Sequence, residues 1–176
     1  MREALRPIPS PSRPISCRAA ERALPPYRYV PGLNAHPFRD PNGSMVNHPK
    51  PDHWDASIPW ELDIAYLHGC DLFDNRYLWE AHETWEGIWH QVPKTDPYRD
   101  LLQGLIQAAA AVLKQHMDFA RASDTLHQRC RARFEAVVTR TGPNFRGLDL
   151  TELMDRLERH RQRGGWPTLP LQWPAP

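Results

Sequence analysis

The residues with the clearest chemical potential lie in one segment, Tyr77 to Val92, which is rich in tryptophan, histidine and glutamate. His82 and Glu86 are four positions apart, so on a helix they would lie one turn apart on the same face. An imidazole beside a carboxylate can act as a general base or acid, with the carboxylate orienting the ring. The same pair can also chelate a metal ion, because nitrogen and oxygen ligands suit zinc, manganese and iron.

A metal site at this pair would need further ligands, because two side chains do not complete a protein metal site. The segment His82-Glu83-x-x-Glu86 resembles the HExxH helix of zinc proteases only superficially, since Glu86 stands at the second histidine position. Further donors would have to come from elsewhere in the chain: His90, Gln107, Asp118, His36 or His48. No metal is therefore expected, and the cofactor stays undefined. If a divalent metal ion does bind, the candidate ligands are His82, Glu86 and His90.

Helical periodicity explains how these side chains would be positioned. Six apolar residues of the segment fall within an arc of roughly 100°, the width of a core-facing stripe: Leu78, Ala81, Trp85, Ile88, Trp89 and Val92. His82 and Glu86 lie at the edge of this stripe, whereas Glu80 and Glu83 lie on the opposite side. We therefore expect ionisable groups at the boundary of the core.

A second helix follows and supplies polar partners. The run LLQGLIQAAAAVL, from Leu101 to Leu113, is apolar on most of its circumference, which is typical of a helix surrounded by others. Gln103 and Gln107 share one side of it, and polar groups on a buried helix need hydrogen-bond partners. Gly104 in the middle of this helix indicates the close approach of a neighbouring helix, and a tryptophan is one candidate for the contact.

The remaining pattern predicts a single all-α domain, a compact bundle of about five helices. Residues 1–26 are proline-rich and have little to bury, so they are expected to be a disordered leader. Residues 27–56 contain aromatic anchors and are interpreted as an extended arm on the body. The helical domain is placed at 57–162, and 163–176 form a proline-rich tail that Trp166 and Trp173 would pin to the surface.

Several helix boundaries carry capping signals. Asp96 followed by Pro97 predicts one helix start, and Asp149 with Glu152 predicts another. The other expected N-caps are Ser57, Asp74 or Asn75, and Ser123. Alternating strand patterns are not visible in the sequence.

These residues resemble a known family. The pattern AHExxExxW on Ala81 to Trp89, followed by QGLIQ on Gln103 to Gln107, is similar to the signature of the bacterial and archaeal domain of unknown function 309 family. The resemblance covers about residues 60–155, and the arm with YVPG and HPxRDP is similar to that of a subset of the family. It implies a small all-α fold and no assigned activity, so no catalytic role is carried over.

Three interpretations of the constellation stay open. His82, Glu86, Gln103 and Gln107 could form a buried polar network that fixes helix register in a binding or interaction module. They could instead line a small-molecule pocket that also involves Glu83, with Trp79 or Trp89 as an apolar platform and the arm residues His36, Arg39 and Asp40 as a lid. The third interpretation is a metal-dependent, hydrolase-like enzyme using His82 and Glu86. Whether the chain is an enzyme is therefore uncertain from the sequence.

The composition of the chain limits the classes of partner that we expect. The formal net charge is only +1, which argues against a general attraction to nucleic acid or anionic membranes. The arginines around Arg129 to Arg133 are interpreted as a solvated face. The three cysteines lack CxxC spacing, and no apolar run reaches the length of a membrane span. A cytoplasmic location is expected, with a protein or a small polar ligand as partner and a homo-oligomer as an alternative.

Overall fold

The computed structural model describes residues 5–13, 15, 17–44 and 53–173. It confirms the predicted all-α class with a short 3-10 helix, five α-helices and a very small hairpin: η1 (Trp60–Leu62), α1 (Ile64–Asp74), α2 (Leu78–Trp89), α3 (Pro97–His116), α4 (Ala120–Thr141), β1 (Asn144–Phe145), β2 (Leu148–Asp149) and α5 (Leu150–Arg163). The strands pair antiparallel, with Asn144 opposite Asp149. They were missed because two residues are too few for an alternating pattern.

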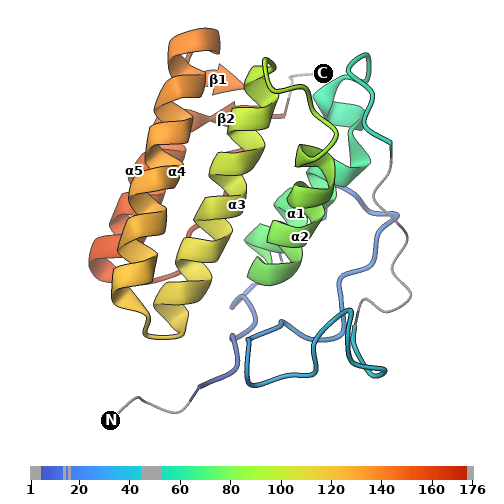
Figure 1. Ribbon diagram of the computed structural model, residues 1–176, viewed down its shortest axis with the longest axis vertical. Coiled ribbons are helices and arrows are strands. Elements are labelled where there is room, and N and C mark those ends of the chain that lie inside the picture. The colour runs from blue at the N-terminus through green and yellow to red at the C-terminus, as the bar shows by residue number, and fades with distance from the viewer. Residues whose placement is uncertain (1–4, 14, 16, 45–52, 174–176) are drawn as a thin grey trace.

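The five helices surround one core, with α3 running between the α1–α2 pair and the α4–α5 pair (Figure 1). This central place agrees with the apolar circumference of α3, on which Leu101, Leu105 and Val112 are fully buried. The largest buried side chains come from α1, α2, α3 and α4 and include Trp85, Tyr66, Tyr98 and Phe134. The core therefore packs against the apolar face of α2, formed by Leu78, Ala81, Trp85 and Ile88.

Side-chain caps confirm two of the predicted helix starts. Asp96 accepts a hydrogen bond from the backbone N–H of Tyr98 at 2.8 Å, and Asp149 accepts one from that of Glu152 at 3.0 Å. Such caps satisfy backbone donors that have no partner within the helix. The sequence signal was strong because the cap residue and the first-turn residues stand next to each other in the chain.

The other predicted caps were wrong. Asp63 caps α1 in place of Ser57, because a 3-10 turn separates Ser57 from the helix. Ser123 lies inside α4, where its hydroxyl donates to the carbonyl of Ala111. α2 begins after Tyr77 without a side-chain cap, and Asp74 and Asn75 use their side chains in other contacts.

Two glycines allow helices to approach closely. A Cβ at Gly104 would lie 2.5 Å from Phe134 Cε1, so the neighbour at Gly104 is a phenylalanine of α4. A Cβ at Gly69 of α1 would overlap the indole of Trp85 in α2. The sequence therefore predicted the close contact at Gly104 but did not reveal the one at Gly69.

Replacing Gly104 with alanine is expected to destabilise the protein although alanine favours helices. The clash with the buried Phe134 ring should outweigh the gain in helix propensity, leaving a net loss of about 1 to 2 kcal/mol in the free energy of unfolding. Urea unfolding followed by circular dichroism measures this loss. Ala136→Ser on the exposed face of α4 is the control, and an increase in stability for Gly104→Ala would contradict the packing argument.

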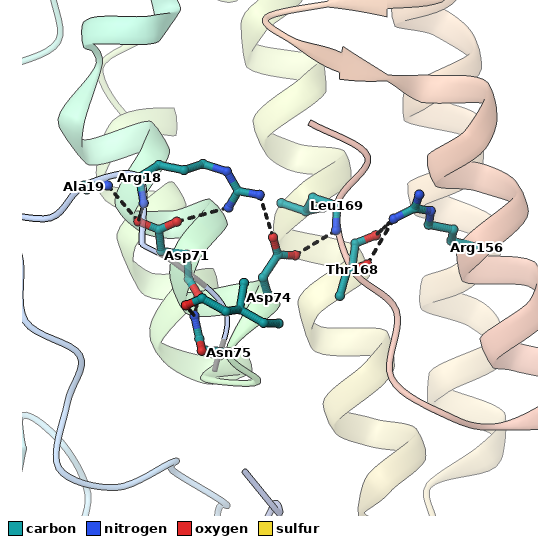
Figure 2. A network of polar contacts seen from close by, with 9 residues as sticks. Arg18, Ala19, Asp71, Asp74, Asn75, Arg156, Thr168 and Leu169 are labelled. Carbon is teal, nitrogen blue, oxygen red and sulfur yellow. Dashed lines mark hydrogen bonds and ion pairs between the residues drawn. The ribbon is translucent and has the colours of Figure 1, made fainter. Parts of the chain in front are cut away.

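The N-terminal segment contacts the helices before residue 27, which the expectation of a disordered leader did not anticipate. Ile8 is 5% exposed and Ala19 is 1% exposed, and both belong to the core cluster. Arg18 places its guanidinium between Asp71 and Asp74, at 3.0 Å and 2.9 Å (Figure 2). These few anchor residues are separated by prolines and form no periodic pattern, so the sequence contained no signal for their contacts.

The C-terminal tail reaches the same end of α1. The backbone N–H of Leu169 donates to Asp74 at 2.7 Å, and Arg156 of α5 donates to the Thr168 hydroxyl at 3.0 Å (Figure 2). Leu169 itself is buried in the core. Residues 18–19 and residue 169, which are distant in the sequence, therefore both contact the last turn of α1.

Candidate functional site

α2 carries the candidate groups on the borders of its buried face. Leu78, Ala81, Trp85 and Ile88 are at most 2% exposed, as the periodicity predicted. Trp89 is only half-buried. The indole N–H of Trp85 donates to the carbonyl of Tyr66, which links α2 to α1. The buried face of α2 is therefore packed in the core and hydrogen-bonded to α1. The candidate residues lie at the borders of this face.

Three of these border residues come together. One donor atom each of His82, Glu83 and Glu86 lies within 4.8 Å of the other two. His82 Nδ1 lies 3.3 Å from Glu83 Oε1, and both side chains are 27% exposed. We call these three residues the α2 cluster. His82 and Glu86 were predicted together from their spacing. Helical periodicity placed Glu83 on the opposite side, yet one of its carboxylate oxygens lies with them.

The following helix, α3, contributes one buried polar atom that has no hydrogen-bond partner among the described residues. Arg99 at the start of α3 stacks on Trp89 at the end of α2, with 4.0 Å between guanidinium and ring centre. Because α2 and α3 run antiparallel from this contact, we infer that Gln107 lies at about the level of His82. Gln107 Oε1 is buried and has no hydrogen-bond partner among the described residues. Gln103, one turn earlier, is half-buried.

The two tryptophans proposed as platforms are already in contact with side chains. Arg99 covers one face of Trp89 and donates to the carbonyls of Trp89 and Val92, at 2.6 Å each. His90, proposed as a metal ligand, is exposed and lies with its ring 5.0 Å from that of Trp89. It is not part of the α2 cluster.

Trp79 lies under the N-terminal arm. Its ring has three aromatic neighbours, with centroids 5.0 to 5.6 Å away: Tyr29, His36 and Phe38. His36 Nδ1 accepts from the backbone N–H groups of Phe38 and Arg39, at 3.3 Å each. A neutral His36 therefore carries its proton on Nε2, which disfavours metal binding by either nitrogen. Arg39 is exposed, and His48 lies outside the described residues.

Glu80 is a buried carboxylate that sequence reasoning had placed on the polar face. Its side chain is fully buried under the arm, and Oε1 accepts from the backbone N–H of Tyr29 at 2.9 Å. Oε2 is buried without a hydrogen-bond partner among the described residues. Burial is the main reason that the pKa of Glu80 rises from 4.5 to about 7. The aromatic residues of the arm were the only available signal that this face would be covered.

Three hollows of the described structure are not lined by the α2 cluster. One of about 170 Å³ includes His127 and Phe134, one of about 200 Å³ includes Trp54 and Ile88, and a shallower one includes Trp166. None of the three is lined by His82, Glu86, Gln103 or Gln107. None of these three hollows therefore offers an enclosed space for an organic molecule at the α2 cluster.

The region around this cluster matches a known family model. Residues 66–126, from α1 into the beginning of α4, match the model of the domain of unknown function DUF309. Over this stretch the chain is similar to the DUF309 family. This confirms the resemblance seen in the sequence, and the family description assigns no activity to the DUF309 domain. No match was found among curated proteins. None of the described helices combines the length and apolarity that a membrane crossing requires.

Proposed function

We propose that the chain is a binding module whose α2 cluster takes a divalent metal ion. The observation that carries this proposal is the mutual approach of His82, Glu83 and Glu86, with one donor atom of each within 4.8 Å of the others. One imidazole and two carboxylates form a donor set that suits manganese, iron or zinc. This proposal departs from the expectation, drawn from the sequence, that no metal binds. His82 and Glu86 alone were too few ligands, and Glu83 would supply the third.

The support beneath the cluster favours binding without a large rearrangement. Ala81 and Trp85, which alternate with the cluster along α2, are fully buried, so the backbone that carries the ligands is fixed. Preorganised ligands lose less conformational entropy when the ion arrives. Gln107 Oε1 supports the same proposal, because a buried amide oxygen without a partner can accept a hydrogen bond from a metal-bound water.

Manganese is a suitable probe, because carboxylate oxygens are among its preferred ligands. The protein, purified without an affinity tag and treated with chelator, is expected to bind a stoichiometric Mn²⁺ ion. Binding is measured by calorimetry and by the loss of the free-ion electron paramagnetic resonance signal. His82→Ala and Glu86→Gln should each abolish stoichiometric binding, since each removes a ligand.

His90→Ala is the matched control for this experiment, because His90 is an exposed histidine at the end of the same helix. It should bind Mn²⁺ as the unmodified protein does. Unchanged Mn²⁺ affinity in both His82→Ala and Glu86→Gln, or no Mn²⁺ binding by the unmodified chain, would disprove the proposal. The remaining interpretation would then be an interaction module in which these side chains only fix helix register.

The same site supports a second candidate, a metal-dependent hydrolase-like enzyme. His82 and Glu83 are each 27% exposed, so an ion bound there keeps coordination positions open to solvent. Open positions are typical of catalytic metal sites, in which a bound water becomes the nucleophile. Metal-dependent cleavage of phosphate or carboxylic esters that disappears in His82→Ala would favour this candidate. The absence of such turnover in the metal-loaded protein would leave the binding module.

The expected cytoplasmic location remains part of this proposal. It is supported by Cys17, Cys70 and Cys130, which are all free thiols, and two of them are buried. Reduced cysteines are typical of cytosolic proteins.

A further inference from the structure

The hollow of about 200 Å³ lies where the segment before α1 meets α2. Its floor includes Ala65 of α1 and Ile88 of α2, which are both buried. Its walls are built from residues 53–64 and include Trp54. A cavity of about 150 Å³ lined by aliphatic and aromatic side chains is large enough to bind benzene. The hollow therefore has room for a ligand with one six-membered ring.

Trp54 is held in place by contacts with two helices. Its backbone N–H donates to the side-chain oxygen of Gln91, just after α2, at 2.9 Å. Its ring centre lies 6.4 Å from that of Tyr98 on α3. A ligand in the hollow therefore meets an aromatic wall that is already ordered, which lowers the entropic cost of binding.

Two large aliphatic side chains that line the hollow are exposed to solvent. Leu62 is 65% exposed and Ile58 is 38% exposed. Among the described residues, no other large hydrophobic side chain is as exposed as Leu62. A single exposed apolar side chain is normal, but two beside an apolar hollow are typical of a surface that a ligand covers.

The charges at the hollow favour a cation. Asp55 lines it, and Oδ1 of Asp55 accepts from the backbone N–H and the hydroxyl of Ser57, at 2.8 Å each. These hydrogen bonds lower the pKa of Asp55, so its carboxylate is charged at neutral pH. The second lining carboxylate, Asp63, is already paired with Arg146 at 2.7 Å. Neither lysine nor arginine is among the described lining residues, and only His53 there can gain a positive charge.

We propose that this hollow binds a small apolar amine, a molecule with one ring and one protonated amino group. The ring packs on Ala65 and Ile88, and the ammonium group pairs with Oδ2 of Asp55 close to the Trp54 ring. Tryptophan is the aromatic side chain that attracts cations most strongly. No residue of the α2 cluster lines the hollow, so this site is independent of the proposed metal-binding function.

The test compares three probes of similar size that differ in charge: phenethylamine, 2-phenylethanol and phenylacetate. Each is added to the chelator-treated full chain, and binding is followed by the shift of the indole N–H resonance of Trp54, which Trp54→Phe identifies. Phenethylamine is expected to bind about three- to tenfold more tightly than 2-phenylethanol, because a carboxylate at the surface and a cation–π contact each contribute modestly. Phenylacetate should bind most weakly.

Two variants and a control locate the site. Asp55→Asn keeps an oxygen for Ser57 but removes the charge, so it should bind phenethylamine and 2-phenylethanol equally well. Leu62→Ser should weaken the binding of both by about threefold or more, because it removes apolar contact with the ligand. Leu62 is 65% exposed, so its replacement does not disturb the core. Leu33→Ser, at an exposed leucine that does not line the hollow, should change neither affinity.

Four outcomes would overturn the proposal. The first two are equal affinity of the unmodified chain for the amine and the alcohol, and a preference for the amine that persists in Asp55→Asn. The others are the absence of phenethylamine binding at millimolar concentrations, and unchanged binding in Leu62→Ser.

Discussion

Replacement of Asp71 by alanine is expected to lower the free energy of unfolding by about 3 to 5 kcal/mol. Asp71 is fully buried, and its carboxylate accepts hydrogen bonds from the backbone N–H groups of Arg18 and Ala19, at 2.7 Å and 2.8 Å. It also pairs with the guanidinium of Arg18 at 3.0 Å. Removing it leaves two backbone donors and a partly buried cation without their acceptor, and each such loss costs about 1 to 3 kcal/mol.

Urea unfolding followed by circular dichroism measures this change, with Asp155→Ala on the exposed face of α5 as the control. The control should remain within about 0.5 kcal/mol of the unmodified protein. A double-mutant cycle with Arg18→Ala separates the ion pair from the two backbone hydrogen bonds. If Asp71→Ala loses less than about 1 kcal/mol, the anchoring of the N-terminal segment at α1 is not a main source of stability.

Replacement of Glu80 by glutamine is expected to remove a pH-dependent loss of stability. The folded protein raises the pKa of Glu80 from 4.5 to about 7, mainly by burial, so between these values the folded state binds more protons than the unfolded state. Stability is therefore lost as pH rises from 4.5 to 7, by up to roughly 3 kcal/mol. Glutamine keeps an oxygen that can accept from Tyr29 but carries no charge, so this loss should be absent.

The measured quantity is the difference in unfolding free energy between Glu80→Gln and the unmodified protein at several pH values. A difference is needed because His127 and His160, whose pKa values are lowered, act in the opposite direction below pH 6.5. Their contribution is present at neutral pH and is lost on acidification. Glu135→Gln, at an exposed glutamate of α4, is the control. A difference that stays constant from pH 4.5 to 8 would show that the folded protein does not perturb Glu80.

The predictable parts of the fold were those with local signals. The helical stripe of α2 and the caps Asp96 and Asp149 lie within a few residues of the structure that they define. Contacts between distant segments had no such signal. Arg18 meets Asp71 across 53 positions, and neither residue has a neighbour that indicates the other.

The candidate site was predictable to the same extent. The spacing of His82 and Glu86 placed both on one face, because helical geometry fixes residues four apart. The contribution of Glu83 depends on the bend of a long side chain, which periodicity cannot describe. Burial of Glu80 depends on the path of an irregular arm, and a helical wheel shows the core face but not what covers the other faces.

The contacts of Arg18, Ala19 and Leu169 with α1 have a consequence for the region that the family model delimits. The core around residues 66–126 is completed by Ala19 and Val30 on one side and by Leu150, Leu157 and Leu169 on the other. A protein trimmed to the matched boundaries would expose these apolar contacts to water and leave the carboxylates of Asp71 and Asp74 without Arg18. The matched region is thus a stretch of similar sequence rather than a unit that can be excised and expected to fold by itself.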